Sequence, residues 1–483
     1  DLVRSRGLGD VYKRQGLYYV DLLDAGDLAS DPINTEDIWV SFDFSGRDLS
    51  GNIILTRNAD DAVLAGSFSK YTHYVPFYRY CGSENSGLME GTWLAMRRTL
   101  TLGDTYFRNN KDRLGITSPE VTLRYGSKIR LYMPSSVVGN GVEGTGGYEG
   151  QEGYSLSSKR PFIVTMEIRD TVSNPLEREG TDVDDFCELN GGLQIYSKGD
   201  DDTPATEVPE DPEDPEHPYN ETSKRWVSAC DSIPQVYVNV RYNPAEPRDQ
   251  LSFPAPYHVG YEPYVSEASV RDIDMQIAEA LKKRFHGEGD DYQKYEGVKA
   301  LEADSVTLDG TAKIWYIGRF LDGFIFDTNI DEVKKIIYGE VAQKGTALDY
   351  TPSSGGMIQA FYYTIPNLKF GQWAELITTS TNAYGSSGKS GSSSSSTSGS
   401  SGYSSSYLDY LNYLNYANSY YGSGGYYGGY YGGYYGNYYG GYYDSMYGYG
   451  YDSSSTGTTV TTITTEIPSF TPLIFQLYIE PED

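Results

Sequence analysis

One stretch in the second half of the chain, residues 315–327, constrains the fold most strongly because it has the pattern of strand, turn and strand. Its first strand alternates apolar and polar positions, the period of a half-buried strand, with apolar side chains at Ala312, Ile314 and Tyr316. Asp322-Gly323 then predicts a tight turn, because glycine accepts a positive φ without steric cost. Aromatic residues return after the turn and end at Asp327, an acid that either caps a turn or belongs to a site.

Further motifs follow this stretch in a fixed order. They are Met357-Ile358-Gln359-Ala360-Phe361, then Gly371, then Asn382-Ala383-Tyr384-Gly385, and finally 467–475 with the sequence Ile-Pro-Ser-Phe-Thr-Pro-Leu-Ile-Phe. Taken together with the distances between them, these motifs resemble the FKBP-type peptidyl-prolyl cis-trans isomerases. The resemblance covers residues 297–385 and 467–480.

The resemblance implies an α+β fold in which an antiparallel sheet curls around one short helix, with an apolar pocket between them. The catalytic side chains that it implies are Asp327, Tyr384 and Tyr316. The substrate-binding side chains that it implies line the pocket, and they are Phe326, Leu348, Tyr350, Met357, Ile358, Phe361, Ile467 and Phe475. The family needs no cofactor and no metal, and its substrates are proline-containing polypeptides.

The chemistry of proline isomerisation suits such a pocket. Rotation about an X–Pro bond breaks amide resonance and crosses a barrier of about 18–20 kcal/mol. Because the twisted amide is less polar than the planar one, a dry aromatic cavity favours the twisted form relative to water. By the resemblance, we expect Tyr384 to hold the substrate carbonyl and Asp327 to bias the electrostatics of the twisted bond.

Two residues depart from the family's pattern. Phe361 stands where the family usually has tryptophan, so the floor of the pocket stays aromatic but lacks an indole N–H. Pro366 falls inside the expected short helix, where proline removes a hydrogen bond and clashes with the preceding turn. We therefore expect this helix to be shortened or kinked after Thr364.

Residues 16–172 repeat the pattern in degenerate form, with Phe44-Ser45-Gly46-Arg47 parallel to Tyr316-Ile317-Gly318-Arg319. The counterparts of Tyr316, Asp327 and Tyr384 in this repeat are Phe44, Leu55 and Val138. Because the acid and both tyrosines are missing, we expect a second FKBP-like domain without catalytic activity. An unrelated β-rich domain is the alternative.

Residues 173–265 separate the two domains and predict an acidic linker with irregular structure. Residues 200–216 combine acids with proline and contain almost no apolar side chain, so they should stay extended and solvated. A calcium site is the alternative, although these acids lack the fixed spacing and the glycine of a calcium loop. Residues 236–240 could form a strand of either domain.

Residues 269–285 predict a helix that Ser269 caps. One apolar face is expected from the spacing of Val270, Ile273, Ile277 and Leu281. Basic residues 282–284 fall in the last turn, where they favour the helix dipole. Ahead of an FKBP-like domain of residues 266–483, such a helix would serve as an arm or a dimerisation element.

Residues 386–458 have low complexity, with a serine tract followed by Tyr-Tyr-Gly-Gly repeats. Glycine and serine are costly to order and few aliphatic side chains are available to bury, so this insertion predicts disorder. It interrupts the family's pattern between Tyr384-Gly385 and Ile467-Pro468. It is either a neutral expansion of a surface loop or a tyrosine-rich arm that gathers partners.

Composition limits the classes of function. A net charge of −29 argues against nucleic-acid binding, which needs a basic face. Three cysteines are too few for a disulfide framework or a zinc site, and Cys187 and Cys230 either pair or remain separate thiols. The four histidines show no ligand spacing, and no apolar run is long enough to span a membrane. Residues 1–15 resemble a translated sequencing adapter and are excluded from the fold.

Two functions from different classes remain. The first is a prolyl isomerase that acts as a foldase or chaperone of exported proteins, with proline-containing polypeptides as partners. By resemblance, we expect it in the bacterial cell envelope, in the periplasm or as a lipoprotein whose N-terminal anchor is missing from this sequence. The second is a non-catalytic scaffold of tandem FKBP-like domains with the tyrosine-rich insertion as its contact surface.

Overall fold

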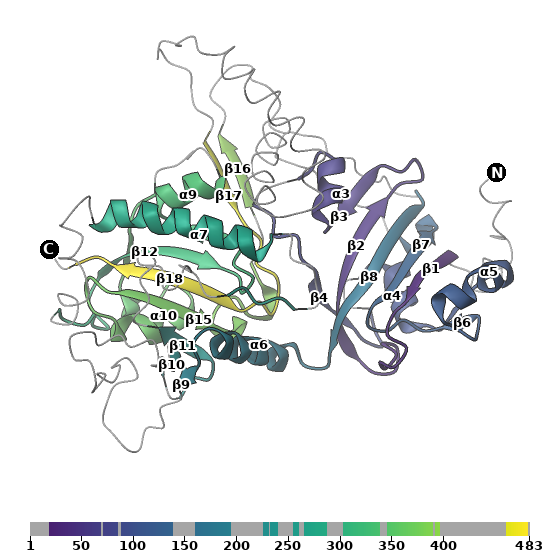
Figure 1. The fold of residues 1–483 in the computed structure, drawn as a ribbon, viewed down its shortest axis with the longest axis horizontal. Helices are drawn as coiled ribbons and strands as arrows, with labels where there is room; N and C mark the ends of the chain where they lie inside the picture. Colours follow the sequence, from purple (N-terminus) through teal and green to yellow (C-terminus); the bar gives the residue numbers. More distant parts are fainter. Residues whose placement is uncertain are drawn as a thin grey trace, which may run out of the picture. The chain divides into compact units, whose positions relative to one another are not determined.

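The structure is a computed structural model that describes residues 19–68, 71–85, 88–138, 160–194, 226–230, 232–239, 255–259, 265–286, 303–338, 345–389, 392–396 and 460–481. The described chain forms two compact units, each of them α+β with mainly antiparallel sheets (Figure 1). The first unit runs to Pro175, and the second contains Leu176–His258 and most of the chain from Val265 onward. Residues 1–15, 200–216 and 397–459, on which several expectations fall, lie outside the described residues.

The first unit is built on a sheet with the strand order β1-β7-β8-β2-β3, in which β4 also pairs with β2. Its strands are β1 (Tyr19–Ala25), β2 (Ile38–Arg47), β3 (Ile53–Thr56), β4 (Phe77–Cys81), β7 (Ser127–Met133) and β8 (Phe162–Val172). Buried and half-buried residues alternate along β7, as expected when one face of a sheet packs on a core. Helix α4 (Glu90–Arg97) packs Leu94, Ala95 and Met96 into this core.

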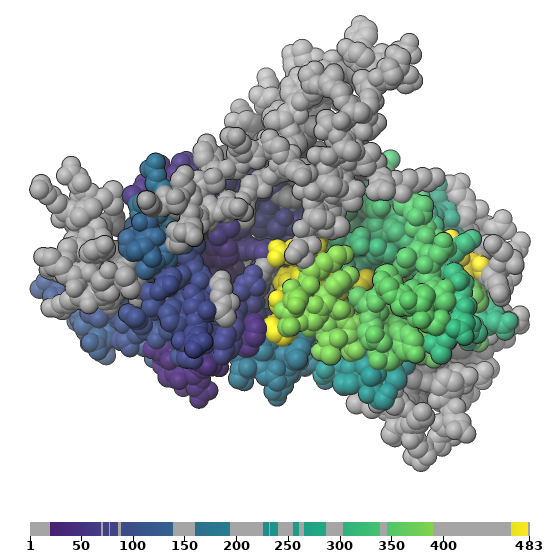
Figure 2. All heavy atoms as spheres, turned by 180° about the vertical axis from the view of Figure 1, so that it is seen from behind, coloured from purple at the N-terminus to yellow at the C-terminus, as the bar shows by residue number. Residues whose placement is uncertain are grey.

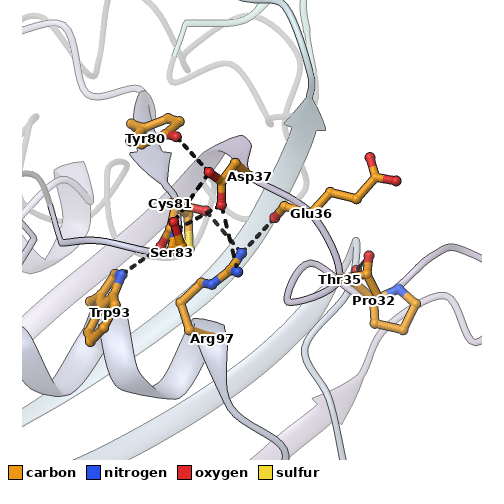
Figure 3. A network of polar contacts seen from close by, with 10 residues as sticks. Pro32, Thr35, Glu36, Asp37, Tyr80, Cys81, Ser83, Trp93 and Arg97 are labelled. Carbon is orange, nitrogen blue, oxygen red and sulfur yellow. Dashed lines mark hydrogen bonds and ion pairs between the residues drawn. The ribbon is translucent and has the colours of Figure 1, made fainter.

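A polar network joins α4 to the ends of β2 and β4 (Figure 3). Asp37, just before β2, accepts hydrogen bonds from the Tyr80 hydroxyl at 3.1 Å and from the Ser83 amide at 2.7 Å. Arg97, at the end of α4, donates to the carbonyl oxygens of Glu36 and Cys81 at 2.6 and 3.3 Å. This network fixes the helix against the sheet.

Short elements complete the first unit. Helix α3 (Ala59–Leu64) begins at Asn58, whose side chain accepts the Asp61 amide. Helix α5 (Asp104–Leu114) ends at Gly115, where a φ of +65° favours glycine. The remaining elements are β5 (Leu100–Thr101), β6 (Glu120–Val121) and the 3-10 turn η1 (Ser135–Val137).

The second unit is built on a larger sheet with the strand order β13-β12-β18-β15-β11-β10-β9, in which β14 also pairs with β12. Its strands are β9 (Leu193–Gln194), β10 (Trp226–Ser228), β11 (Val236–Asn239), β12 (Ala312–Arg319), β13 (Ile325–Thr328), β14 (Leu348–Tyr350), β15 (Trp373–Thr378) and β18 (Leu473–Ile479). Every residue of β15 and β18 is buried. In Figure 2 the yellow C-terminal segment accordingly shows only in small patches among green atoms. The turn predicted at Asp322-Gly323 is confirmed, with Gly323 at a φ of +91°.

Helix α7 (Glu267–Leu281) covers one face of this sheet, beside α9 (Asp331–Tyr338) (Figure 1). Its predicted apolar face is buried, so the helix is part of the unit rather than a separate arm. The predicted cap at Ser269 is wrong, because the Ser266 hydroxyl accepts the Ser269 amide at 3.3 Å and starts the helix earlier. A buried ion pair of 2.6 Å joins Asp274 of α7 to Arg319 of β12. The helix continues into a π-helical turn, η2 (Lys282–His286).

The opposite face of the sheet meets the short helix α10 (Gln359–Thr364). A 3-10 turn, η5 (Ile365–Asn367), follows it and contains Pro366. The prediction that proline shortens this helix after Thr364 is therefore confirmed.

The expectation of an irregular linker over 173–265 is wrong for a large part of that range. Helix α6 (Pro175–Leu189) and strands β9, β10 and β11 lie within it. β11 pairs with β15, so the strand expected near 236–240 belongs to the second unit. The linker was predicted too broadly because acids and prolines dominate the neighbouring sequence, so the apolar face of α6 was not recognised.

The two units share one strand arrangement, since β1-β7-β8-β2-β3 follows the same order as β11-β15-β18-β12-β13. Gly46 pairs with Leu55 and Val164, and Gly318 pairs with Asp327 and Phe475. Each glycine directly precedes a register shift. By these registers, Phe44 occupies the position in the first unit that Tyr316 occupies in the second. Leu55 likewise occupies the position of Asp327.

The counterpart of Tyr384 is displaced by one residue from the expectation. Gly126 and Gly371 both have positive φ and donate their amides to Ile168 and Ile479, which occupy matching places in β8 and β18. Gly139 lies as many residues after Gly126 as Tyr384 lies after Gly371. The counterpart of Tyr384 is therefore Gly139 and not Val138. Gly139 lies outside the described residues.

Candidate functional site

Two polar side chains meet where β12 pairs with β13. The Tyr316 hydroxyl donates a hydrogen bond of 2.9 Å to Asp327 Oδ2, and both residues are half-buried. The backbone around them is fixed as well, because the Tyr316 amide donates to Asn329 Oδ1 at 2.8 Å and the Thr328 hydroxyl donates to the Tyr316 carbonyl at 2.7 Å. The pair is therefore held by both strands.

The surroundings keep the Tyr316 phenol protonated. Burial raises its pKa well above the ordinary value for tyrosine, and the charge of Asp327 and its hydrogen bond raise the pKa further. The Tyr384 phenol adds a smaller contribution in the same direction. Tyr316 is therefore a hydrogen-bond donor to Asp327 and not a base.

Beside this pair lies a cluster of aromatic rings centred on Phe475 in β18. The Phe475 centroid lies 5.1 Å from that of Phe361, 5.7 Å from that of Phe326 and 6.3 Å from that of Tyr316. Tyr350 extends the cluster from Phe361 at 6.0 Å. The contacts of Phe475 with Phe326 and Phe361 are edge-to-face, a favoured geometry for aromatic rings.

Gly318 allows this cluster to form. A Cβ at this position would lie 2.6 Å from the Phe326 ring, too close for any other residue without a shift. Glycine at this position thus lets the Phe326 ring pack closely against β12. Phe326 is 6 % exposed and Phe361 is fully buried.

The other predicted binding residues lie around the cluster. Leu348 is half-buried and pairs with Ile314 across β14 and β12. Ile358 is the buried N-cap residue of α10, whereas Met357 before it is 37 % exposed. Ile467 is buried, and Tyr384 is half-buried. Met357 is therefore the most accessible of the apolar side chains assigned to the site.

The chain enters and leaves the insertion next to Tyr384. Lys389 and Ile467 exchange two backbone hydrogen bonds of 2.8 and 2.9 Å, and the Phe470 amide donates to the Gly385 carbonyl at 3.3 Å. Lys389 Nζ lies 5.4 Å from the centroid of the Tyr384 ring. Strands β16 (Ser392–Ser396) and β17 (Val460–Thr464) then pair, so the expectation of disorder is wrong for this part of the serine tract.

Two polar residues that contribute to this region, Asn329 and Glu179, were not predicted from the sequence. Asn329 bridges strands through the Tyr316 amide and through the carbonyls of Ile314 and Thr346. Glu179 of α6 binds Ser380, four residues before Tyr384. A helical spacing of buried side chains at Glu179, Val183 and Phe186 is the signal that could have revealed α6.

The described residues contain no group of three or more acids, histidines and cysteines that could hold a metal. Within those same ranges no helix has the length and apolar character needed to cross a membrane. The three cysteines are free thiols: Cys81 and Cys187 are buried and Cys230 is half-buried. Cys187 and Cys230 therefore do not pair.

Neither a protein-family model nor a curated protein matches the chain. Among solved structures, the three FKBP domains of wheat FKBP73 match with 9% identity and a TM-score of 0.20, over 98% of this chain and 97% of that one. A peptidyl-prolyl cis-trans isomerase from Pseudomonas syringae pv. tomato matches with 14% identity and a TM-score of 0.16, over 37% of this chain and 65% of that one. AtFKBP13 matches with 13% identity and a TM-score of 0.19, over 32% of this chain and 92% of that one. At such TM-scores these matches establish neither a family nor a function for this chain.

Proposed function

We propose that the second unit is a peptidyl-prolyl cis-trans isomerase of the FKBP type. The observation that carries this proposal is the hydrogen bond of 2.9 Å between Tyr316 and Asp327, placed beside a cluster of buried rings centred on Phe475. The order and spacing of the sequence motifs support it independently. The proposed substrates are polypeptides that contain proline.

The proposed mechanism needs only binding and electrostatics. The apolar side chains around the rings would receive the proline ring and remove water from the preceding amide, which favours the less polar twisted form. Tyr384 would donate a hydrogen bond to the substrate carbonyl. Asp327, oriented by Tyr316, would place its negative charge beside the rotating bond. No covalent intermediate forms, because the reaction only rotates one bond.

A protease-coupled isomerisation assay on short X–Pro peptides tests this proposal with the full chain. The uncatalysed step takes tens to hundreds of seconds, so acceleration is easily measured. We expect Asp327→Asn to lower kcat/KM by about a hundredfold, a range typical for loss of one electrostatic contact. Asp309→Asn, which removes an exposed acid of the same unit, is the matched control and should leave the rate unchanged. A folded wild-type chain without acceleration on several peptides would refute the proposal.

A non-catalytic binding or scaffold function is the second candidate. The observation that favours it is the close packing of Phe326, Phe361 and Phe475 on one another, which leaves each of them at most 6 % exposed. This candidate predicts that X–Pro peptides bind, as measured by titration calorimetry, without any acceleration of isomerisation. Binding that vanishes together with the rate in Asp327→Asn would contradict it.

The location in the cell envelope and the role in folding exported proteins are kept as parts of the proposal. They are motivated only by the resemblance of the motifs. Fractionation of source cells with an antibody against the second unit tests the location. Recovery in the cytoplasmic fraction alone would refute this part and would leave the proposed chemistry untouched.

A further inference from the structure

Helix α6 buries Glu179 inside the second unit. Glu179 lies in its second turn and is 2 % exposed. The neighbouring Gly180 lets the helix approach the turn before β11, because a Cβ there would lie 2.2 Å from the side chain of Gln235. On the next turn of α6, Asp184 accepts a hydrogen bond of 2.8 Å from the Tyr237 hydroxyl of β11. The backbone of α6 is thus tightly placed where Glu179 projects.

The Glu179 carboxylate binds one residue twice. The Ser380 hydroxyl donates to Oε2 at 2.8 Å, and the Ser380 amide donates to Oε1 in a short hydrogen bond. Ser380 is 1 % exposed and begins the 3-10 turn η6 (Ser380–Asn382), which is closed by the bond from the Ala383 amide to the Ser380 carbonyl at 2.8 Å. Tyr384 follows this turn directly.

The backbone of Tyr384 therefore lies between two anchors. Glu179 holds the residue that starts the preceding turn, and the bond between Gly385 and Phe470 holds the residue that follows. Loss of the first anchor would leave the start of this turn held by backbone bonds alone, chiefly the bond of 3.4 Å from the Thr379 amide to the Gln235 carbonyl. A phenol that must meet a substrate carbonyl depends on such positioning, since misplacement by about 1 Å can cost on the order of a hundredfold in rate.

The charge of Glu179 has little compensation. The acid facing it is Asp182 on the same helix, which is itself paired with Arg178 at 3.1 Å. Across from α6, the contacting groups are the neutral Ser380 and, next to Gly180, the neutral Gln235. Burial raises the pKa of Glu179 to about 7, the two bonds from Ser380 lower it and Asp182 raises it.

We infer that Glu179 is a positioning residue for the proposed isomerase site, which acts through Ser380 and the turn that it begins to fix the place of Tyr384. This inference rests on the proposed function. The first unit provides an internal comparison, because Ser135 begins the matching 3-10 turn η1 and is half-buried rather than fully buried. α6 belongs to the second unit alone.

The test measures kcat/KM of the full chain across pH 5–9 for four variants. We expect Glu179→Ala to lower kcat/KM by about tenfold or more, because the turn loses both acceptors. Glu179→Gln keeps an acceptor and should retain most of the activity at acid pH. Ser380→Ala removes only the hydroxyl bond and should give a smaller loss. Glu177→Gln, an exposed acid on the same helix, is the matched control and should behave as wild type.

The pH profile separates positioning from a merely structural role. Ionised carboxylates accept stronger hydrogen bonds than neutral ones, so wild-type kcat/KM should rise as pH passes about 7. This step should be absent in Glu179→Gln and present in Glu177→Gln. Hydrogen exchange of the Ser380 amide should be faster in Glu179→Ala, while circular dichroism shows the fold retained.

The outcomes distinguish this inference from the proposed function. An inactive wild-type chain would overturn both. An active wild type with unchanged kcat/KM in folded Glu179→Ala would overturn the inference alone. So would a loss that Glu179→Gln fails to relieve, or a step near neutral pH that persists in Glu179→Gln, because either result assigns Glu179 a purely structural role.

Discussion

The same row of cross-strand positions has opposite chemistry in the two units. In the first unit it holds Asp43, Glu167 and Lys128, with Arg169 bonded to both acids at 2.6 and 2.9 Å. In the second unit the matching row is Trp315, Tyr478 and Trp373. Phe285, in the π-helical turn η2 that continues α7, packs against all three rings with centroids 4.7–6.0 Å apart. In the second unit, α7 covers the face that carries the aromatic row. In the first unit, the side chains of the ion-paired row stay partly exposed.

The other face differs just as sharply. Around the Tyr316–Asp327 pair, the second unit places large rings at Phe326, Phe361 and Phe475. The first unit has Ile54, Thr92 and Val164 at the matching places of strand and helix. Strand order and register are thus preserved while the side chains that could do chemistry are not. The same sheet therefore carries either a candidate site or a plain core, depending on the side chains at a few positions.

The largest expected effect comes from removing β11, the counterpart of β1. A fragment of residues 266–483 lacks α6 and β9 to β11, and we expect it to lose cooperative unfolding, whereas 176–483 keeps it. Val236, Val238 and Trp226 are fully buried, and each apolar side chain of this size contributes about 1.5–3 kcal/mol. Their sum is comparable to the total stability of a domain, about 5–15 kcal/mol. Thermal melts of the two fragments decide this, and a cooperative transition in the shorter one would show that β11 is not an integral strand.

The next effect concerns two arginines at matching positions. Arg319 pairs with Asp274 where both side chains are 2 % exposed, whereas Arg47 pairs with Asp61 where they are 39 and 20 % exposed. We expect Arg319→Met to lower the free energy of unfolding by about 3–5 kcal/mol, since it leaves a buried charge unpaired. Arg47→Met should cost about 0–1 kcal/mol.

Urea unfolding of both arginine variants measures this difference. Adding Asp274→Leu to Arg319→Met should recover most of the loss, because the unpaired charge is then removed. Equal losses for Arg47→Met and Arg319→Met would mean that the two units use this position alike. That result would remove one of the clearest differences between them.

Features that depend on neighbouring residues in the chain can be predicted from the sequence, whereas features that depend on distant contacts cannot. Alternation of apolar residues and the Asp322-Gly323 turn are local signals, and they predict β12, β13 and the hairpin between them. The shortening of α10 at Pro366 is local as well. Tyr316 and Asp327 are site residues by the resemblance and not by local pattern, and the hairpin then brings their side chains within hydrogen-bond distance.

Other features depend on distant contacts and could not be predicted in this way. Glu179 lies far from Ser380 in the chain, and no pattern in either segment indicates their hydrogen bonds. The buried partner of Arg319 belongs to α7, and local sequence gives Asp274 no sign of burial. The start of α7 at Ser266 instead of Ser269 depends on which of two nearby serines meets a free helix amide, which spacing alone does not decide.

A smaller effect distinguishes the matching 3-10 turns η6 and η1 through pH. The pKa of Glu179 in the folded chain, about 7, is raised above the ordinary value of 4.5. Its proton therefore adds stability that is fully present below pH 4.5 and is lost as pH rises through about 7. Relative to Glu179→Gln, the wild type should lose up to about 3 kcal/mol of unfolding free energy across this range.

Denaturant unfolding at several pH values measures this loss, with Glu177→Gln as the control that keeps the wild-type dependence. Ser135→Ala, in the first unit, should change stability equally at each pH, since α6 and its Glu179 belong to the second unit. A wild-type chain that follows Glu179→Gln at every pH would show that the carboxyl is not held in a desolvated site. The two turns would then not differ in how the stability of the chain at each of them depends on pH.

The smallest effect concerns the insertion of the second unit, which is much longer than residues 139–159 at the matching place of the first unit. β16 and β17 pair, and Lys389 pairs with Ile467, so the ends of 397–459 start from neighbouring strands. Replacing 397–459, which lies outside the described residues, by a short Gly-Ser turn therefore leaves the ladder of β16 and β17 closed. Shortening the connection between β16 and β17 by about four halvings of its length should stabilise the unit by at most about 2 kcal/mol. Activity on a small X–Pro peptide should persist, because Tyr384 and Ile467 remain fixed by the same backbone bonds.

Thermal melts and the peptide assay measure both results, and a pull-down of large partners with and without the insertion tests its role as a capture arm. Loss of cooperative unfolding on replacement would mean that the tyrosine repeats pack against the unit and contribute to its stability.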